Sequence, residues 1–502
     1  MVEIELKFQI DPAQRTAVQR AVAGRGSAAQ TIRLQARYFD TPDGRLAAAG
    51  LALRLRREGR SRWVQTLKGR GDGVMHRLEH EVVLPAGQPA TLDLMRHDGT
   101  PAGTALRAAL AAQKGGLAEH FATDIRRTRR VVRTRGGEGD AASVELAFDE
   151  GWIVARAGER QRKLAVAEIE FELLDGSPQA LLALASRWVQ RHGLWLDVRS
   201  KAERGHGLAS DALPAAVTAQ PSLLGRRMTP ARALAAMVQS SLAQVLPNLA
   251  VVAEGTQAGP EHVHQLRVGL RRLRTALREF GHGVEGVDPT WEATLAQAFA
   301  ALGTLRDRDI TGQILAAARA AATAAGLDAA ATPVPAATLS ARDSAPMRER
   351  GLQGLLLALI DFELGSAHSA AGEPLIDLAR KRLGRLHQRI AADGARFDEL
   401  DDAARHGLRK RLKRLRYSLE FVATLFGRKA LARYLALLKP AQEALGEFND
   451  VLIAETACRA TAPHSVGDAF VLGWLSARRD ALADLAAHRL RALAAAPRFW
   501  KA

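Results

Sequence analysis

Cysteine is almost absent from this sequence: Cys458 is the only one among 502 residues. A single thiol cannot form a disulfide within the chain, so nothing in the sequence supports an oxidising compartment. The first residues, MVEIELKF, turn acidic at the third position and lack the apolar core of a signal peptide. We find no run that approaches the ~18 uncharged apolar residues of a membrane helix. We therefore expect a cytoplasmic protein with no membrane partner.

Aromatic residues are also scarce, at 5% of the chain with three Tyr. Proteins that bind single-stranded nucleic acid stack bases on aromatic side chains, so this composition disfavours that function. Charge, in contrast, is strongly unbalanced, because 71 Lys and Arg against 54 Asp and Glu give a net charge of +17. Such an excess indicates an anionic partner, namely nucleic acid, an anionic membrane or a phosphate compound, unless it serves solubility alone.

Two textures divide the chain, which is too long for a single core. Residues 1–208 contain short alternating segments broken by Gly and Asp, whereas residues 229–502 are rich in Ala and Leu at helical spacing. Residues 209–228 are predicted to be a linker, because small residues and two prolines dominate there. In the helical half we expect a first repeat at about 229–325, a loop at 326–346 and a second repeat at about 347–502. The predicted fold class is multidomain α+β.

Several segments of the first half alternate charged and apolar residues. Residues 2–8 place Glu3, Glu5 and Lys7 on one face of a strand, and residues 53–56, 78–82, 144–149 and 168–173 repeat the pattern. One such strand alone would have a solvated face. Their repetition favours a closed or nearly closed antiparallel barrel with a charged lining. Helices beginning at Asp11-Pro12 and around 178–192 are expected to cover its apolar outside.

A lining with charges of both signs has a chemical consequence. Clustered carboxylates repel one another unless a cation lies among them, and Glu3, Glu5, Glu170 and Glu172 are natural oxygen ligands for Mg²⁺ or, alternatively, Mn²⁺. Clustered Arg and Lys bind phosphate oxygens. The cations expected in that role are Arg54, Arg56, Lys68, Arg127, Arg129 and Lys201. The predicted substrate is therefore a phosphate–metal complex, in which the metal polarises the phosphoryl group.

An ordered series of motifs resembles the CYTH domain, the triphosphate tunnel metalloenzyme superfamily, over residues 1–208. The motifs are Glu3-x-Glu5-x-Lys7, RYFDTPDGRLAAAGLALRLRREG (37–59), WVQTLKGR (63–70), Glu79 with Glu81, TDIRRTRR (123–130), VELAFDEGWI (144–153), EIEFEL (168–173) and SKAERG (200–205). The resemblance implies a tunnel of eight antiparallel strands. Members of the family include inorganic, thiamine and RNA triphosphatases and class IV adenylyl cyclases, which these motifs do not separate.

The resemblance also implies roles for individual residues. The implied catalytic residues are Glu3, Glu5, Lys7, Glu170 and Glu172. The implied metal ligands are Glu3, Glu5, Glu170 and Glu172, with Glu81 and Asp149 nearby. The implied phosphate contacts are Lys7, Arg54, Arg56, Lys68, Arg127 and Lys201. Strand register decides which of Arg126, Arg127 and Arg129 faces inward, and we favour Arg127.

A motif of the helical half occurs twice. HQLRVGLRRLR (264–274) recurs as HGLRKRLKRLR (406–416), and LGTLRDRDI (302–310) recurs as LGEFNDVLI (445–453). The repeat predicts two related helical bundles. The expected buried stripe of the first copy is Leu266, Leu270, Leu273, Leu277 and Phe280.

Each copy also carries a basic stripe on another helical face. The first basic stripe is His264, Arg267, Arg271 and Arg274, and the second basic stripe is His406, Arg409, Lys413 and Arg416. Like charges four residues apart repel, so a solvated face without acidic partners would cost stability. Two stripes, each headed by His, therefore predict an anion site.

With KRLRYSLEF (413–421), these repeats resemble the CHAD domain, a histidine-containing helical domain, over roughly residues 229–495. The resemblance implies that the stripes bind long-chain inorganic polyphosphate. Bacterial proteins with this CYTH–CHAD order include inorganic triphosphatases, which makes tripolyphosphate the expected substrate.

Three functions remain open at this point. The first is Mg²⁺-dependent hydrolysis of tripolyphosphate to pyrophosphate and phosphate, or of another triphosphate such as thiamine triphosphate or a nucleotide. The second is non-catalytic polyphosphate binding, with association with polyphosphate granules. The third is nucleic-acid binding by the basic helices, which the low aromatic content and the lack of a reader motif disfavour.

Overall fold

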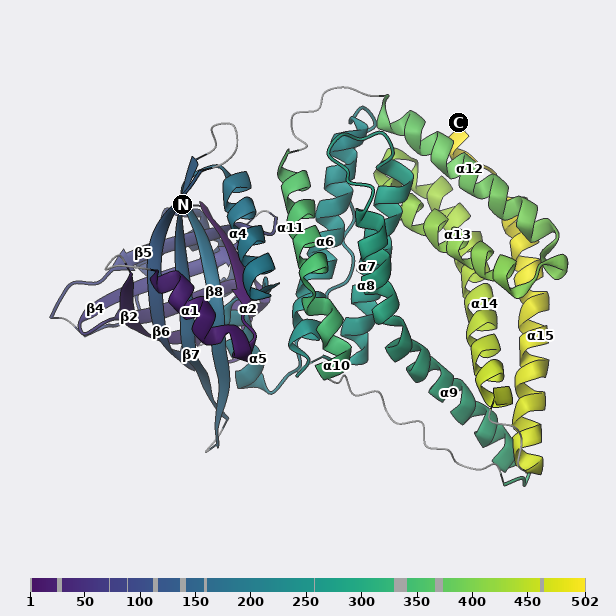
Figure 1. Ribbon diagram of the computed structural model, residues 1–502, viewed down its shortest axis with the longest axis horizontal. Coiled ribbons are helices and arrows are strands. Elements are labelled where there is room, and N and C mark those ends of the chain that lie inside the picture. The colour runs from purple at the N-terminus through teal and green to yellow at the C-terminus, as the bar shows by residue number, and fades with distance from the viewer. Residues whose placement is uncertain are drawn as a thin grey trace. The chain divides into compact units, whose positions relative to one another are not determined.

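The computed structural model describes residues 2–24, 29–71, 73–87, 89–111, 116–135, 141–157, 160–256, 258–328, 341–365, 373–460 and 465–501 (Figure 1). The chain forms two compact units. The first comprises Met1–Val217, Val245–His262 and Ser344–Asp361, and the second comprises Thr218–Gln244, Val263–Asp343 and Phe362–Ala502. Two segments of the helical half thus belong to the unit that contains the strands, and the domain boundaries drawn from the sequence stay a prediction.

The first unit is built on a closed antiparallel barrel. Its strands are β1 (Val2–Gln9), β2 (Gln30–Asp40), β3 (Leu51–Glu58), β4 (Arg62–Arg70), β5 (His76–Val83), β6 (Ala118–Arg135), β7 (Ala141–Ala157) and β8 (Arg160–Gly176). They are ordered β5-β4-β3-β2-β6-β7-β8-β1, and pairing of β5 with β1 closes the barrel. A short β9 (Trp195–Leu196) adds to the other end of β1. The predicted barrel of eight strands is confirmed.

Helices cover the apolar outside of the barrel, as the alternation predicted. Leu53 of β3 and Leu67 of β4 share a buried cluster with Leu46 of α2 (Arg45–Ala48) and Leu106 of α3 (Pro101–Leu110). On β8, Phe171 packs edge-on against Trp188 of α4 (Pro178–His192). The segment after Asp11 forms a 3₁₀ turn (Pro12–Gln14) and then α1 (Arg15–Ala23), which contacts β6 and β7. Figure 1 shows α1 lying along these strands.

One end of the barrel interior is apolar and is closed by a helix. Tyr38 of β2 stacks on Phe121 of β6 with ring centroids 4.5 Å apart, in a cluster that includes Ala202 of α5 (Lys201–Ser210). The same face of the strands supplies Leu34, Ala36, Ile125, Ile153 and Ala155 to this cluster. Charged residues therefore line only the rest of the barrel, which the sequence analysis did not anticipate.

The helical half has the expected α-helical structure. Its helices are α6 (Pro230–Glu254), α7 (Pro260–Phe280), α8 (Trp291–Ala301), α9 (Gly303–Ala324), α10 (Ala341–Ser344), α11 (Arg350–Gly365), α12 (Leu375–Ala395), α13 (Asp402–Phe421), α14 (Arg428–Ala460) and α15 (Val466–Ala494). The predicted apolar stripe of α7 is buried along its whole length. Most of the loop expected at 326–346 lies outside the described residues, and α10 occupies 341–344.

One expectation about hydropathy needs correction. Residues 233–253 of α6 carry no charged side chain, and among the described helices α6 alone is long and apolar enough to cross a membrane by length and composition. Its most apolar stretch is 72% buried inside the protein. A buried core helix passes the same test, because the Ala, Leu and Val that pack a protein core also give high hydropathy.

Helix α5 should tolerate substitution by alanine at one of its glycines and not at another. A Cβ on Gly205 would lie 2.2 Å from the Phe121 ring, whereas on Gly207 its nearest neighbour, the Ala212 carbonyl oxygen, would be 3.6 Å away. We expect Gly205→Ala to lower the free energy of unfolding by about 1–3 kcal/mol through overpacking. Gly207→Ala, the matched control, should be neutral or stabilising because Ala favours helix. Thermal or urea unfolding measures both, and equal stability of the two variants would contradict a tightly packed barrel end.

Candidate functional site: the charged barrel interior

Cross-strand register brings charges from distant parts of the sequence onto one inner surface. Residues directly opposite each other in an antiparallel pair point to the same face of the sheet. Three rows of such residues cross β1, β8, β7 and β6: Glu5/Glu172/Glu145, Lys7/Glu170/Ala147/Arg129 and Gln9/Glu168/Asp149/Arg127. Alternation within each strand predicted which residues share a face, and the register shows which of them meet.

The first cluster in the barrel is a balanced ion-pair network around Arg127. Its guanidinium donates two hydrogen bonds to Asp149, each of 2.7 Å, and also contacts Glu170. Lys201, the first residue of α5, places Nζ 2.6 Å from carboxylate oxygens of both Asp149 and Glu168 and 2.9 Å from Glu170. Burial disfavours the charge of Lys201, but these three carboxylates outweigh it and hold its pKa well above the usual value.

Glu168 belongs to this network, although the sequence analysis assigned it no role. It is fully buried and accepts hydrogen bonds from Arg204 at 2.9 Å and Gln9 at 3.2 Å. The sequence contained one indication of such a role, because Glu168 shares a strand face with Glu170 and Glu172. The partners that make it structurally important come from α5, which no strand pattern could reveal.

Asp149, Glu168 and Glu170 hold carboxylate oxygens within 4.8 Å of one another and could bind a metal ion. However, three cations, Arg127, Lys201 and Arg204, already balance these three carboxylates. A divalent cation would have to displace ammonium and guanidinium groups that are buried with them. The contacts of these three carboxylates are therefore those of a balanced ion-pair network.

A second cluster has an excess of negative charge. Lys68 Nζ lies 2.9 Å from Glu3 and 2.8 Å from Glu79. The weaker pairs are Arg77 with Glu5 at 3.6 Å and Arg129 with Glu145 at 3.5 Å. The remaining carboxylate of the cluster, Glu172, lies opposite both Glu5 and Glu145. Five carboxylates thus face Lys68, Arg77 and Arg129, and Arg54, which is shared with Glu81, is a fourth cation 3.9 Å from Glu79. The cluster holds more carboxylates than cations, which suits a hard divalent cation.

The pKa values in this second cluster reflect burial first and the neighbouring charges second. Burial, helped by the neighbouring Glu79 and Glu5, raises the pKa of Glu3 to about 9 despite the opposing effect of Lys68. Burial alone would raise the pKa of Glu79, but Lys68, the hydrogen bond with Glu3 and the charge of Arg54 together outweigh it and lower the pKa of that carboxyl. Burial and then Glu145 raise the pKa of Glu172. Burial among other carboxylates thus raises the pKa of both Glu3 and Glu172, and a divalent cation bound to this set would offset that cost.

A third cluster presents guanidinium groups to the interior. Arg54 and Arg56 lie 3.6 Å and 3.2 Å from Glu81, which also accepts a hydrogen bond of 2.9 Å from Thr66. Arg56 also pairs with Glu58. Among the described residues, the buried Nε atoms of Arg54 and Arg56 have no hydrogen-bond acceptor. Buried donors without acceptors are costly, and phosphate oxygens would supply the missing partners.

The position of the Lys7 side chain is fixed by hydrogen bonds with residues of the same unit. Its ammonium donates to the carbonyl of Arg199, whose guanidinium is fixed by Asp197 at 2.8 Å and by Glu254 of α6 at 2.8 Å. Nearby, the Leu196 amide donates to Gln353 of α11 at 2.8 Å. The two helical segments that belong to the first unit thus support the strand that carries Lys7.

The register also decides the question of the three arginines. Arg126 points outward and pairs with Glu150 at 3.0 Å, whereas Arg127 lies in the inner row. Arg129 shares the inner face but is more exposed. The placements therefore agree with the preference for Arg127, and the catalytic, metal and substrate roles of all these residues remain predictions.

In the second unit, the basic stripes do have acidic partners, which corrects one premise of the sequence analysis. In the first stripe, Arg274 is bound by Glu292 of α8 at 2.7 Å. In the second, Arg409 lies 3.3 Å from Asp450 and Arg416 lies 3.1 Å from Glu420. These interactions make the stripes less costly to the fold than isolated rows of like charges.

An aromatic ring and a neighbouring helix also support the stripes. The Arg267 guanidinium lies 4.4 Å and that of Arg271 lies 4.9 Å from the centre of the Phe299 ring. Arg271 Nη1 is 3.4 Å from the Tyr417 hydroxyl, which links α7 to α13. In the second copy His406 is 3.1 Å from Asn449, within the repeated LG block. The side chains of residues 304–309 in the first LG block lie outside the described residues.

The first unit thus belongs to the class of closed antiparallel barrels whose interior joins buried Arg and Lys to a larger number of carboxylates. Comparison with known families agrees with this class. The CYTH domain model matches residues 1–206 and the CHAD domain model matches residues 236–459. The chain therefore belongs to the proteins that carry a CYTH domain followed by a CHAD domain.

Individual relatives cover parts of the chain. The inorganic triphosphatase of Haemophilus influenzae is 30% identical over 216 residues, 41% of this chain and 55% of that protein, so the chain spans about half the length of this relative. A CHAD domain structure from the plant Ricinus communis is 28% identical, covering 57% of this chain and 98% of that one, with a TM-score of 0.47. A Hippeastrum protein described as an adenylyl cyclase candidate with dominant triphosphatase activity is 20% identical, covering 42% and 97%, with a TM-score of 0.29.

Removal of one carboxylate from the buried ion-pair network should lower the free energy of unfolding more than the loss of one exposed ion pair. We expect Glu168→Gln to lower the free energy of unfolding by about 3 kcal/mol, because it leaves Lys201 and Arg204 buried with too little negative charge. Asp124→Asn, which breaks an exposed pair with Arg33 on the same barrel, should cost less than about 1 kcal/mol. Urea unfolding followed by circular dichroism compares them, and similar costs would show that the inner network is not desolvated.

Proposed function

We propose that the chain is a Mg²⁺-dependent triphosphatase that hydrolyses tripolyphosphate to pyrophosphate and phosphate inside the barrel. The observation that carries the proposal is the opposition of two surfaces. A carboxylate-rich cluster faces buried arginines, Arg54 and Arg56, whose Nε atoms have no acceptor among the described residues. A metal-bound phosphate chain satisfies both. The inorganic triphosphatase of Haemophilus influenzae, which matches the chain at 30% identity, supports this choice.

The metal ligands fit the second cluster best. Glu3, Glu5 and Glu172 would hold Mg²⁺, with Glu79 and Glu145 close enough to bind it or its waters, whereas Asp149 and Glu170 keep their pairs with Arg127 and Lys201. Glu81, paired with Arg54 and Arg56, would act mainly by orienting them. When bound, the metal supplies charge neutralisation and polarisation of phosphate oxygens. Mn²⁺ also accepts an all-oxygen site, so the choice between the two metals rests on availability.

The cations would bind and orient the phosphate chain. Arg54 and Arg56 offer the Nε atoms that lack acceptors, and Lys68 can turn from Glu3 and Glu79 toward phosphate once a metal neutralises those carboxylates. Lys7 reaches the same face from β1. Positioning plus electrostatic stabilisation accounts for most of the catalysis of phosphoryl transfer, and this interior supplies both.

The function and its metal site can be tested together. We expect purified protein with Mg²⁺ to release phosphate from tripolyphosphate faster than from ATP or thiamine triphosphate. Glu172→Gln should lower the rate about 100-fold or more, because it removes a hard ligand and a charge. Glu150→Gln is the matched control, since this residue lies on the outward face of β7. Release from another triphosphate alone would change the substrate, and absence of release from all three would favour a binding protein without catalysis.

A second function, polyphosphate binding, is favoured by the paired stripes of the second unit. Arg271 and Lys413 occupy equivalent places in the two copies and are partly exposed. The two helices are linked by the contact of Arg271 with Tyr417. Two basic surfaces on linked helices could bind one long anion together and so gain affinity. Two predictions on location remain: a cytoplasmic location, which rests on the composition of the chain, and association with polyphosphate granules, which rests on this second function.

Neutralising both stripes should weaken polyphosphate binding by the full chain. We expect Arg271→Gln with Lys413→Gln to raise the Kd for long-chain polyphosphate about tenfold or more and to reduce its dependence on salt, because fewer counterions are released. Arg433→Gln, at an exposed position of α14 outside the stripes, should change the Kd little. Fluorescence anisotropy at several salt concentrations measures both. Preference for duplex DNA over polyphosphate at physiological salt would instead make nucleic acid the partner.

A further inference from the structure

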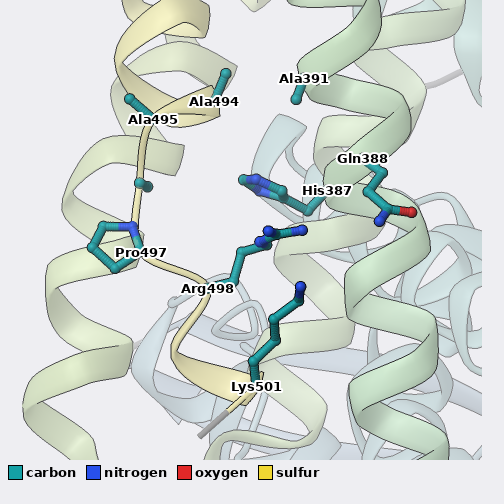
Figure 2. A pocket seen from close by; sticks show the side chains of 9 residues that line it. His387, Gln388, Ala391, Ala494, Ala495, Pro497, Arg498 and Lys501 are labelled. Carbon is teal, nitrogen blue, oxygen red and sulfur yellow. The ribbon is translucent and has the colours of Figure 1, made fainter.

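A cavity of about 610 Å³ lies in the second unit, between α12 and the segment that follows α15. None of its lining residues belongs to either basic stripe. His387 and Gln388 of α12 and Arg498 and Lys501 of the following segment form its polar wall, and alanines and Pro497 form the rest. Figure 2 shows the His387 ring, the Arg498 guanidinium and the Lys501 ammonium turned toward the same space.

The segment that carries the two cations is firmly anchored. Trp500, between Arg498 and Lys501, is completely buried, with its ring 5.0 Å from that of Tyr434 and 5.7 Å from that of His387. Its carbonyl accepts a hydrogen bond of 3.0 Å from Arg380 of α12. The aromatic anchor therefore fixes the backbone from which Arg498 and Lys501 extend, and both reach the cavity from a defined position.

The wall of the cavity consists of hydrogen-bond donors without counter-charge. His387 is buried, and its Nδ1 lies 2.7 Å from the Tyr434 hydroxyl, which fixes the orientation of the ring. Among the residues that the structure describes, neither Arg498 nor Lys501 forms an ion pair, and no carboxylate lines the cavity. Burial and then the charge of Arg498 lower the pKa of His387, which shows that the two groups interact unfavourably when both are charged.

We propose that this cavity is a second oxyanion site, independent of the barrel and of the stripes, which binds a phosphate-type anion. A guanidinium fork, an ammonium group and the amide of Gln388 offer donors to several phosphate oxygens at once, and the described lining residues, which include no carboxylate, suit an anion better than a metal cation. The anion is either free pyrophosphate or the end of a polyphosphate chain, since both present the same terminal phosphate chemistry.

Chemical protection tests the site in the unmodified full-length protein. Phenylglyoxal modifies arginine side chains, and peptide mass spectrometry gives the rate at each position. We expect saturating pyrophosphate, added without metal, to slow modification of Arg498 about tenfold, with no change at Arg389, an exposed arginine on α12 outside the cavity. If long-chain polyphosphate also protects Arg498 in a parallel experiment, the end of a polyphosphate chain is a second ligand of the site. Protection by neither anion, or equal protection by sodium chloride at matched ionic strength, would overturn the proposal.

Two variants provide an independent test. Arg498→Gln with Lys501→Gln should remove one pyrophosphate-binding event of the full chain in calorimetry, or weaken it about tenfold, while triphosphatase activity and thermal stability stay unchanged. Arg389→Gln is the matched control. An unaltered binding isotherm in the double variant would overturn the proposal, because no other described cation lines the cavity.

Discussion

The burial of charge inside a closed barrel is the constraint on which the rest of this structure depends. An isolated carboxylate or ammonium group is costly to remove from water, so each inward-facing charge requires a partner at close range. Around Arg127 the partners are complete, and three cations balance three carboxylates. Around Glu3 and Glu172 they are incomplete, and burial together with neighbouring carboxylates raises the pKa of both groups. This difference in balance is the reason for our proposal that the first cluster is structural and the second binds the metal.

Helix α5 connects the fold of the barrel to its chemistry. Its N-terminus is fixed by a reciprocal pair of hydrogen bonds between Ser200 and Glu203, which places Lys201 directly over Asp149 and Glu170. Its apolar side then packs on Tyr38 and Phe121 and closes one end of the interior. A closed, apolar end lowers the local dielectric and strengthens every ionic interaction beside it. The same helix therefore completes the core and supplies a cation to the site.

Two segments of the helical half contribute side chains to the compact unit that contains the barrel. Glu254 and Gln353 belong to the compact unit of the barrel and bind Arg199 and the Leu196 backbone, on the segment that carries the acceptor for Lys7. The second unit contains the basic stripes and the donor-lined cavity beside His387. Basic side chains thus gather in separate places along the chain, in keeping with its net charge of +17.

The sequence alone determined which residues share a strand face or a helix face, and it determined the duplication of the helical half. The alternation of charged and apolar residues dictates that Glu3, Glu5 and Lys7 share a face, because successive side chains of a strand point to opposite sides. The 3–4 spacing of leucines likewise dictates the buried face of α7, and the repeated HxLR and LG blocks establish the duplication. These features depend on neighbours along the chain, which a sequence displays directly.

Only the tertiary structure decided how those faces meet. Register selected Arg127 over Arg126, and it aligned Glu5 with Glu172 and Glu145, residues that are remote in the chain. The burial of Glu168 against Lys201 and Arg204, and the pairing of the stripe residues Arg274 and Arg409 with Glu292 and Asp450, follow from packing between elements. Charge balance in a site is a sum over groups brought together in space, so a linear pattern can nominate its members but cannot show which of them are already neutralised.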